Sequence, residues 1–338
     1  MKKIAIEEHF YTDDLMEHLK ARNDFNRLEI KVDEKGNRIE RIHYFEFYPG
    51  TLSALSDKGE GRLQVMDEAG IDVAVLSLGN PGPEIFDAAT GTSLAQKIND
   101  ELHHIVMKYP KRFVGLASIA YQDPIASARE LERSVRELGL KGAKIHSHLE
   151  GEFLDQDKFR IIFEKAAELH IPLYLHPKMP SPDMAKPYFP YSALAGPMFG
   201  FGVQTGLQAL RLICSGLFDI CPNLKIILGH LGEALPFWLW RLDKPWRDGH
   251  KPDPETAKIK KMPSEYFRNN FFITTSGMFW EPALLCSVMA LGADKVLFAV
   301  DHPFESSKRA VEFLNTASLA DVDKELIYHT NAERLFGI

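Results

Sequence analysis

KIAIEEH, residues 3–9, is the first of a series of short apolar segments that are bounded by polar or turn residues. Seven more follow it: IDVAVLSL (71–78), FVGLASIA (113–120), GAKIHSH (142–148), PLYLHP (172–177), LKIILGH (224–230), FFITTSG (271–277) and VLFAVDHP (296–303). Short runs rich in branched apolar residues and bounded by polar or turn residues are typical of buried β-strands. The sequence therefore predicts eight strands.

Helical patterns separate most of these strands. They include SLAQKINDELHHIVMKY (93–109), PIASARELERSVRELG (124–139), DKFRIIFEKAAELH (157–170) and EPALLCSVMALG (281–292). Alternation of strand and helix indicates a parallel sheet, and eight repeats favour a closed (β/α)₈ TIM barrel of the α/β class. An open, doubly wound sheet is the alternative, but no G-x-G-x-x-G motif follows the first strand.

Two long segments interrupt this alternation. Residues 11–60, which contain RIHYFEFYPG (41–50), follow the first strand, and residues 178–205 follow the fifth. Loops of this length serve as lids, binding loops or contacts between subunits, so a role at the site and an arm packed on a sister subunit both fit them. We expect residues 1–338 to form a single domain, because barrels of this length are commonly one domain.

The composition argues against several classes of protein. Apolar residues make up 45% and charged residues 26%, as in a globular protein with a sizeable core. The net charge of −7 offers no basic surface to nucleic acid or anionic lipid. Cys214, Cys221 and Cys286 lack C-x-x-C spacing, which favours a reducing compartment. No apolar run reaches the ~18 residues of a membrane span, so we expect a cytoplasmic protein.

Polar residues gather at the carboxyl ends of the predicted strands, where barrel enzymes place their chemistry. They are Glu7, His9, His146, His148, His176, His230, Ser276, Asp301 and His302. Because side chains alternate along a strand, Glu7 and His9 share one face and Glu8 points away from it. An isolated carboxylate is costly to bury, and a cation bound jointly with the imidazole removes that cost.

Agreement among several strand ends strengthens the case for a metal. Glu7, His9, His176 and Asp301 come from the first, fifth and last strands, and the first and last strands of a closed barrel are neighbours. Carboxylates with two imidazoles suit Zn²⁺, Mn²⁺ or Fe²⁺, and the absence of cysteine ligands disfavours a structural zinc site. The sequence therefore predicts a catalytic site for a divalent metal ion.

The segment GHLGEALPFWLWRLD, residues 229–243, supplies further candidates. His230 ends the sixth strand, and a glycine-containing turn places Glu233 near it, where a carboxylate can fix one imidazole tautomer for acid–base or positioning work. Arg241, on the following helix, suits a substrate carboxylate. A Glu–Arg pair that joins the loop to the helix explains the same residues without a substrate.

Together these segments resemble the amidohydrolase-related metal-dependent decarboxylases, which include γ-resorcylate, 2,3-dihydroxybenzoate and 5-carboxyvanillate decarboxylases. The resemblance rests on EEHF (7–10), YLHP (174–177), GHLGEALPFWLWRLD, ITTSG (273–277) and DHPFE (301–305), and it covers most of the chain. It implies a barrel that removes CO₂ from a hydroxylated aromatic acid of the ortho-hydroxybenzoate type. It also implies one divalent ion, Zn²⁺ or Mn²⁺, no organic cofactor, and a homodimer or homotetramer.

The resemblance also implies roles for individual residues. It makes Glu7, His9, His176 and Asp301 metal ligands, places His230, Glu233 and Arg241 in the active site, and puts Phe304 in the ring pocket. His146, where the family often has Asn, is a further candidate for contact with the substrate. In the expected reaction, Asp301 protonates the ring carbon before CO₂ leaves, while His230 and Glu233 adjust its protonation or hold the substrate.

The main alternative is a metal-dependent hydrolase of lactones or amides on the same barrel. Lys144 supports it, because a carbamylated lysine on the fourth strand can bridge two metals. The E-x-H pattern of the first strand, in place of H-x-H, and the early position of Lys144 in its strand argue against it. Two further functions fit the same residues: a hydratase of an unsaturated dicarboxylate, and a non-catalytic barrel in which the ion only stabilises the fold.

Overall fold

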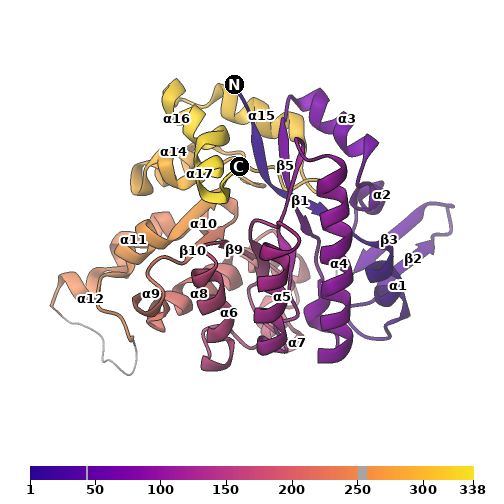
Figure 1. Cartoon of the computed structure of the whole chain (residues 1–338), viewed down its shortest axis with the longest axis horizontal. Helices are drawn as coiled ribbons and strands as arrows, with labels where there is room; N and C mark the ends of the chain where they lie inside the picture. Colours follow the sequence, from indigo (N-terminus) through magenta and orange to yellow (C-terminus); the bar gives the residue numbers. More distant parts are fainter. Residues whose placement is uncertain (43–44, 250–256) are drawn as a thin grey trace.

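The structure is a computed structural model that describes residues 1–42, 45–249 and 257–338. Residues 43–44, which fall within the predicted insertion 11–60, and residues 250–256 lie outside the described residues. Parallel strands occupy the centre of the molecule, and helices surround them (Figure 1). That the chain forms one domain stays a prediction.

In the part of the chain that the structure describes, eight parallel strands form the centre, and each predicted strand is confirmed. They are β1 Ile4–Phe10, β5 Val73–Leu78, β6 Phe113–Gly115 with β7 Ala117–Ser118, β8 Ala143–His146, β9 Pro172–His176, β10 Lys225–Leu228, β11 Phe271–Thr274 and β12 Val296–Leu297. The third strand is thus split into two pieces, β6 and β7. Several predicted strands extend beyond the carboxyl ends of the observed strands, because the polar residues at those ends lie in loops.

Backbone hydrogen bonds join these strands into a ring. One sheet has the order β1-β5-β6 and the other the order β12-β11-β10-β9-β8-β7, so the consecutive pieces β6 and β7 link them at one edge. At the other edge, the N–H of Asp301 donates to the carbonyl of Glu7 at 3.0 Å, and the N–H of His9 donates to the carbonyl of His302 at 2.8 Å. The chain after β12 therefore runs beside β1, and the predicted (β/α)₈ barrel is confirmed.

The predicted helices between the strands are also present. The longer helices are α3 Glu60–Ala69, α4 Ala88–Lys108, α5 Pro124–Arg136, α6 Arg160–Glu168, α8 Gly200–Cys214, α11 Leu235–Leu242, α13 Pro263–Asn270, α14 Glu281–Leu291 and α15 Ser307–Thr316. Shorter ones are α9 Leu217–Ile220, α10 His230–Glu233, α12 Lys244–Arg247, α16 Asp321–Glu325 and α17 Asn331–Phe336. Asp87 and Asp123 cap α4 and α5 with their carboxylates, which explains where these helices begin. Among the described residues, every helix is too short or too polar to cross a membrane.

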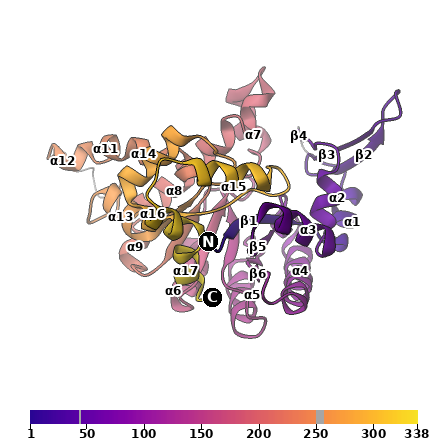
Figure 2. The same cartoon turned by 90° about the horizontal axis from the view of Figure 1, so that it is seen from above.

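Both insertions contain regular structure that the loop interpretation missed. Residues 11–60 form α1 Asp13–Ala21, the antiparallel strands β2 Leu28–Val32, β3 Arg38–Ile42 and β4 Phe45–Glu46, and α2 Thr51–Ser56. Residues 178–205 form α7 Pro182–Ala185, the 3₁₀ turns Lys186–Tyr188 and Ser192–Ala195, and the first turn of α8. The β2–β3 hairpin and α7 project from the same side of the barrel (Figure 2).

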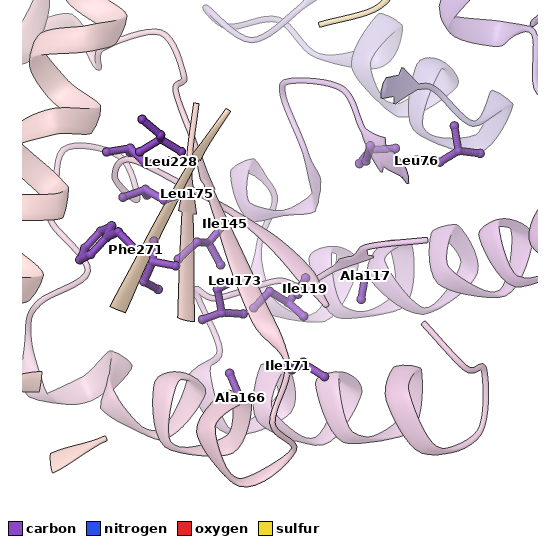
Figure 3. Packing of buried hydrophobic residues seen from close by; sticks show 14 of the residues in the cluster. Leu76, Ala117, Ile119, Ile145, Ala166, Ile171, Leu173, Leu175, Leu228 and Phe271 are labelled. Atoms are coloured by element: carbon purple, nitrogen blue, oxygen red, sulfur yellow. The ribbon is translucent and has the colours of Figure 1, made fainter. Parts of the chain in front are cut away.

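Among the strands beneath the carboxyl end of the barrel, β1, β5, β8 and β9 are buried along their whole length. Leu173, Leu175 and Leu228 are fully buried in the hydrophobic core between the strands and the helices (Figure 3). Continuous burial is expected of parallel strands that are covered on both faces. The packed register places His146 of β8 directly opposite His176 of β9, so the two strands end at the same level.

Asn99 ties α4 to the barrel through a fully satisfied buried amide. Its Nδ2 donates to the carbonyl of Ser118 at 2.9 Å and to Glu130 Oε1 at 2.7 Å. Its Oδ1 accepts from the N–H of Ser118 at 2.8 Å. Because the side chain is fully buried, water cannot replace these bonds.

We expect Asn99→Ala to lower the free energy of unfolding by about 2–4 kcal/mol, since each buried group left without a partner costs ~1–3 kcal/mol. Urea unfolding followed by circular dichroism measures the change. Asn269→Ala, at an exposed position of α13, is the matched control and should stay within ~0.5 kcal/mol of the wild type. A loss no larger than that of the control would show that the amide network contributes little.

Candidate metal centre

Four side chains meet at the carboxyl end of the barrel: Glu7 and His9 on β1, His176 at the end of β9, and Asp301 after β12. One ligand atom from each lies within 4.8 Å of all the others. His176 Nε2 is 2.9 Å from Glu7 Oε1, and His9 Nε2 is 3.2 Å from Asp301 Oδ1. Strand alternation turns Glu7 and His9 to this face, and Glu8 is not part of the group.

The atoms that face the middle of this cluster have no protein partner among the described residues. Glu7 Oε1, His9 Nε2 and His176 Nε2 are all buried without a hydrogen bond. His176 Nδ1 donates to the carbonyl of Pro177 at 2.7 Å, so Nε2 carries a lone pair. The hydroxyl of Tyr174 donates to Glu7 Oε2 and leaves Oε1 toward the cluster. Two imidazoles and two carboxylates arranged in this way fit a divalent ion such as Mn²⁺ or Zn²⁺.

The protonation states agree with this fit. Burial by itself would raise the pKa of Glu7, but the charge of His230 and the nearby imidazoles of His176 and His9 hold it well below its usual value. Burial lowers the pKa of His176 well below its ordinary value. Burial, followed by the charge of Glu7, raises the pKa of Asp301. Glu7 is therefore ionised and His176 neutral, and each has a lone pair for a cation.

A left-handed turn holds His230 beside the cluster. Residues 230–234 all have positive φ, between 50° and 77°. This region costs an L-residue roughly 1–2 kcal/mol, and such strain concentrates at functional sites. The turn brings His230 Nδ1 to 2.8 Å from Glu233 Oε1. A Cβ on Gly232 would lie 2.9 Å from Ile273 Cγ2, which explains the glycine.

The predicted pairing of His230 with Glu233 is therefore present in the structure, and the pair faces the cluster. His230 Nε2 is 3.9 Å from Glu7 Oε1. Burial lowers the pKa of His230, but the charges of Glu233 and Glu7 outweigh that effect and raise it to about 10. The imidazole is thus a cation in a site that contains several carboxylates, and its Nε2 can donate a hydrogen bond.

The cluster adjoins a largely apolar cavity of about 790 Å³, which His176 and Asp301 line. His176, His230, Glu233, Asp301 and Phe304 all line it. The ring of Phe304 lies 5.9 Å from the ring of His9, between centroids. Both insertions contribute to the wall, with Ile42, Phe47 and Tyr48 from the first and Met179, Met198 and Phe199 from the second. The insertions therefore help to form the cavity, as the binding-loop interpretation predicts.

Two predicted substrate contacts lie away from this cavity. Arg241 is exposed on α11 and is not among the described residues that line it. Leu239, two positions before Arg241, is buried. Residues two positions apart in a helix point to roughly opposite sides, so Arg241 faces away from the core. His146 is buried behind His176, with 6.1 Å between ring centroids, and its Nδ1 is 3.1 Å from Glu84 Oε1. Direct contact of either residue with a substrate stays a prediction that this geometry does not favour.

Lys144 lies deeper in the barrel than the cluster. It is opposite Tyr174 in the register of β8 and β9, two residue pairs below His146 and His176. Its Nζ donates to the carbonyl of Leu78. Burial lowers the pKa of Lys144 to about 8. This depth and this hydrogen bond disfavour a bridging lysine of the kind that a binuclear hydrolase uses.

The structure adds functional candidates that sequence reasoning missed. Tyr174 and His176 lie two residues apart on β9 and therefore share a strand face. The alternation in YLH could thus have indicated that Tyr174 lies near the metal site. Asn80 follows β5, and its Nδ2 donates to the carbonyl of Pro177 at 2.5 Å. Glu84 and Lys178 form a buried ion pair next to the cavity, but they are far apart in the sequence and no periodic pattern marks them.

Comparison with known proteins identifies the family. Residues 42–338 match the family model described as Amidohydrolase. The chain belongs to the amidohydrolase family. It is 36% identical over 345 residues to a γ-resorcylate decarboxylase from Polaromonas sp., and the match covers 99% of this chain and 98% of the relative. The predicted resemblance to the amidohydrolase-related decarboxylases is thereby confirmed.

Solved structures of other amidohydrolase-related enzymes have the same fold. A dihydroxybenzoic acid decarboxylase from Polaromonas sp., with bound manganese and the inhibitor 2-nitroresorcinol, is 36% identical with a TM-score of 0.86, covering 99% of this chain and 97% of that one. A 5-carboxyvanillate decarboxylase from Novosphingobium aromaticivorans, complexed with manganese and 4-hydroxy-3-methoxy-5-nitrobenzoic acid, is 35% identical. Its TM-score is 0.88, with coverage of 100% and 96%.

We expect chelator-treated protein to bind one Mn²⁺ per chain, because the unpartnered atoms of the cluster converge on one point. Isothermal titration calorimetry measures the affinity, and saturating Mn²⁺ should also raise the melting temperature. His176→Ala should weaken binding by about 100-fold or more, since loss even of a supporting residue costs ~10–100-fold. His104→Ala, exposed on α4, is the control and should bind normally. Unchanged affinity of His176→Ala would exclude the cluster as the binding site.

Proposed function

We propose that the chain is a metal-dependent, non-oxidative decarboxylase of a hydroxylated aromatic acid of the ortho-hydroxybenzoate type. The observation that carries this proposal is the cluster of Glu7, His9, His176 and Asp301, which adjoins a mainly apolar cavity through His176 and Asp301. The decarboxylases among the relatives support it. An apolar cavity with a few polar groups at one place suits an aromatic ring that carries an acid group.

Glu7, His9, His176 and Asp301 are the proposed ligands of one Mn²⁺ or Zn²⁺ ion. When bound, the ion supplies Lewis-acid stabilisation of negative charge on an ortho oxygen of the substrate. Residues that do not bind the ion hold its ligands in place. Tyr174, for example, orients the carboxylate of Glu7 by a hydrogen bond. Such supporting contacts fix the direction of each lone pair.

Asp301 is the proposed proton donor. Direct loss of CO₂ would leave an unstabilised aryl carbanion, so the ring carbon that carries the carboxylate takes a proton first. The proton moves from the carboxyl of Asp301 to that carbon; the bond to the carboxylate then breaks, its electron pair returns to the ring, and CO₂ leaves. Asp301 afterwards regains a proton. A positioned acid typically contributes ~10²–10⁴-fold to the rate.

His230 and Glu233 are the proposed contacts of the substrate carboxylate. Glu233 accepts a hydrogen bond from His230 Nδ1, so Nε2 is directed toward the cluster and the cavity. A cationic imidazole there binds the substrate carboxylate or returns a proton to Asp301. Phe304 packs against the ring, and the apolar walls favour the departure of neutral CO₂ over retention of the charged acid.

We also propose that the enzyme works in the cytoplasm as a homodimer or homotetramer, as a single domain and without an organic cofactor. Large aromatic side chains support an assembly: Tyr191, Phe237 and Trp240 are each more than 70% exposed. Exposed apolar side chains of this size are typical of surfaces that another subunit covers. The choice between Mn²⁺ and Zn²⁺ is settled by metal analysis of the purified protein, because both accept these ligands.

Asp301→Asn tests the mechanism, because it keeps an oxygen near the ion but removes the acidic proton. We expect the turnover number with Mn²⁺ to fall by about 10²–10⁴-fold while the melting temperature changes little. CO₂ release from a panel of ortho-hydroxybenzoates measures turnover, and elemental analysis checks that the metal is retained. Asp183→Asn, on an 89% exposed side chain of α7, is the control and should keep full activity.

Two results would contradict this proposal. Turnover that survives Asp301→Asn removes Asp301 as the proton donor. Cleavage of lactones or esters, with no CO₂ released from any hydroxybenzoate, assigns the chain to the hydrolases of the same family.

A further inference from the structure

Lys178 is a buried cation on the wall of the cavity. It follows β9, two residues after His176, and its side chain is only 6% exposed. Among the described residues that line the cavity, it is the only lysine or arginine. Lysine is almost never buried unless it is paired, so its position in an apolar wall needs an explanation.

Glu84 is the partner that holds Lys178 in place. Lys178 Nζ is 3.2 Å from Glu84 Oε1, and the carboxylate of Glu84 is buried in the loop after β5. Burial alone would raise the pKa of Glu84, but His146 and Lys178 hold it well below its usual value. The pair is therefore ionic. A second carboxylate, Glu150, is 4.0 Å from Nζ, beyond hydrogen-bond distance, and is 57% exposed.

The ammonium group has donors left for a ligand. A lysine carries three N–H donors, and the hydrogen bond to Glu84 uses one of them. Since Lys178 lines the cavity, the remaining donors can reach a molecule bound there. A buried ammonium that meets no acceptor in the cavity is disfavoured, so the site prefers a ligand that brings an oxygen.

Lys178 lies on a different part of the cavity wall from His230, Glu233 and Asp301. His230 and Glu233 follow β10, and Asp301 follows β12. Lys178 instead follows β9 and is anchored to the loop after β5, on the side of the barrel where His146 ends β8. A ring bound at the cluster with its carboxylate toward His230 can therefore direct a further substituent toward Lys178, which lines the same cavity.

We propose that Lys178, positioned by Glu84, binds a second oxygen substituent of the aromatic ring and makes the enzyme selective for dihydroxylated over monohydroxylated benzoates. This inference rests on the proposed function and specifies its substrate class. Hydrogen bonds from a charged donor are about twice as strong as neutral ones. Among the described residues that line the cavity, the other charged side chains are the carboxylates Glu233, Asp301 and Glu305 and the imidazole of His230 beside the cluster. Lys178 is therefore the cation that can attract a partly ionised hydroxyl away from the cluster.

A pair of ligands that differ by one hydroxyl isolates this contact. The probes are 2-nitroresorcinol, the inhibitor bound in the Polaromonas structure, and 2-nitrophenol, which lacks one hydroxyl. Titration calorimetry with Mn²⁺-loaded protein, at a pH where both probes are ionised, gives the ratio of their dissociation constants. We expect the wild type to prefer 2-nitroresorcinol by about 10- to 100-fold, and Lys178→Met to reduce that preference to within about 3-fold.

Further variants separate recognition from folding. Lys178→Met leaves Glu84 buried without its partner, so the double variant Lys178→Met with Glu84→Gln removes both charges and should show the same loss of preference. Lys178→Arg keeps a cation and should retain part of the preference. Lys186→Met, in the same insertion but 74% exposed and paired with Asp183, is the matched control and should bind both probes as the wild type does.

Turnover gives a second readout. The ratio of kcat/KM for 2,6-dihydroxybenzoate to that for 2-hydroxybenzoate should fall by about 10- to 100-fold in the Lys178→Met variant, mainly through the dihydroxylated substrate. Equal weakening of both probes, or a wild type that does not distinguish them, would overturn the inference. If the wild type distinguishes the probes through Lys178 but no hydroxybenzoate yields CO₂, the proposed function fails while the binding contact stands.

Discussion

The carboxylate of Glu7 is completely buried, and the rest of the site depends on how its charge is balanced. One oxygen accepts a hydrogen bond from Tyr174, and the other faces His9 and His176 without a hydrogen bond. A buried charge without a partner costs several kcal/mol, even after the protein relaxes. A divalent ion satisfies the carboxylate and both imidazoles at once. Metal affinity and stability of the fold are therefore coupled in this barrel.

Backbone strain occurs next to this charge. Asp301 has a φ of 78°, and the turn from His230 to Ala234 is left-handed throughout. Such conformations persist only where the surroundings over-determine them. Here the fully packed strands below, with Leu173 and Leu228 in the core, hold the loop ends at fixed positions. The apolar core thus maintains the geometry of the polar site, and such fixed positions favour a candidate site that is already ordered before a ligand binds.

Simple physical rules predict much of this arrangement from sequence. Alternation along β1 places Glu7 and His9 together, and the strand-end positions of His176 and Asp301 follow from barrel geometry. The orientation of Arg241 could not be deduced in this way, because it depends on which face of α11 packs inward. The alternation in LEIKV, residues 28–32, was a signal for β2 that the loop interpretation of 11–60 overlooked. Glu84 and Lys178 carry no periodic signal, since only the folded barrel brings their loops together.

The hydrogen-bonded seam between β1 and the chain after β12 affects how the protein is made. The same peptide groups that close the ring belong to Glu7, His9 and Asp301, so ring closure and assembly of the cluster are one event. A ribosome releases the amino-terminal strand first, and a nascent chain lacks Asp301 until almost all of the barrel has been translated. Tight capture of an ion therefore follows synthesis of the last strand, and shortened chains are left without a complete set of ligands.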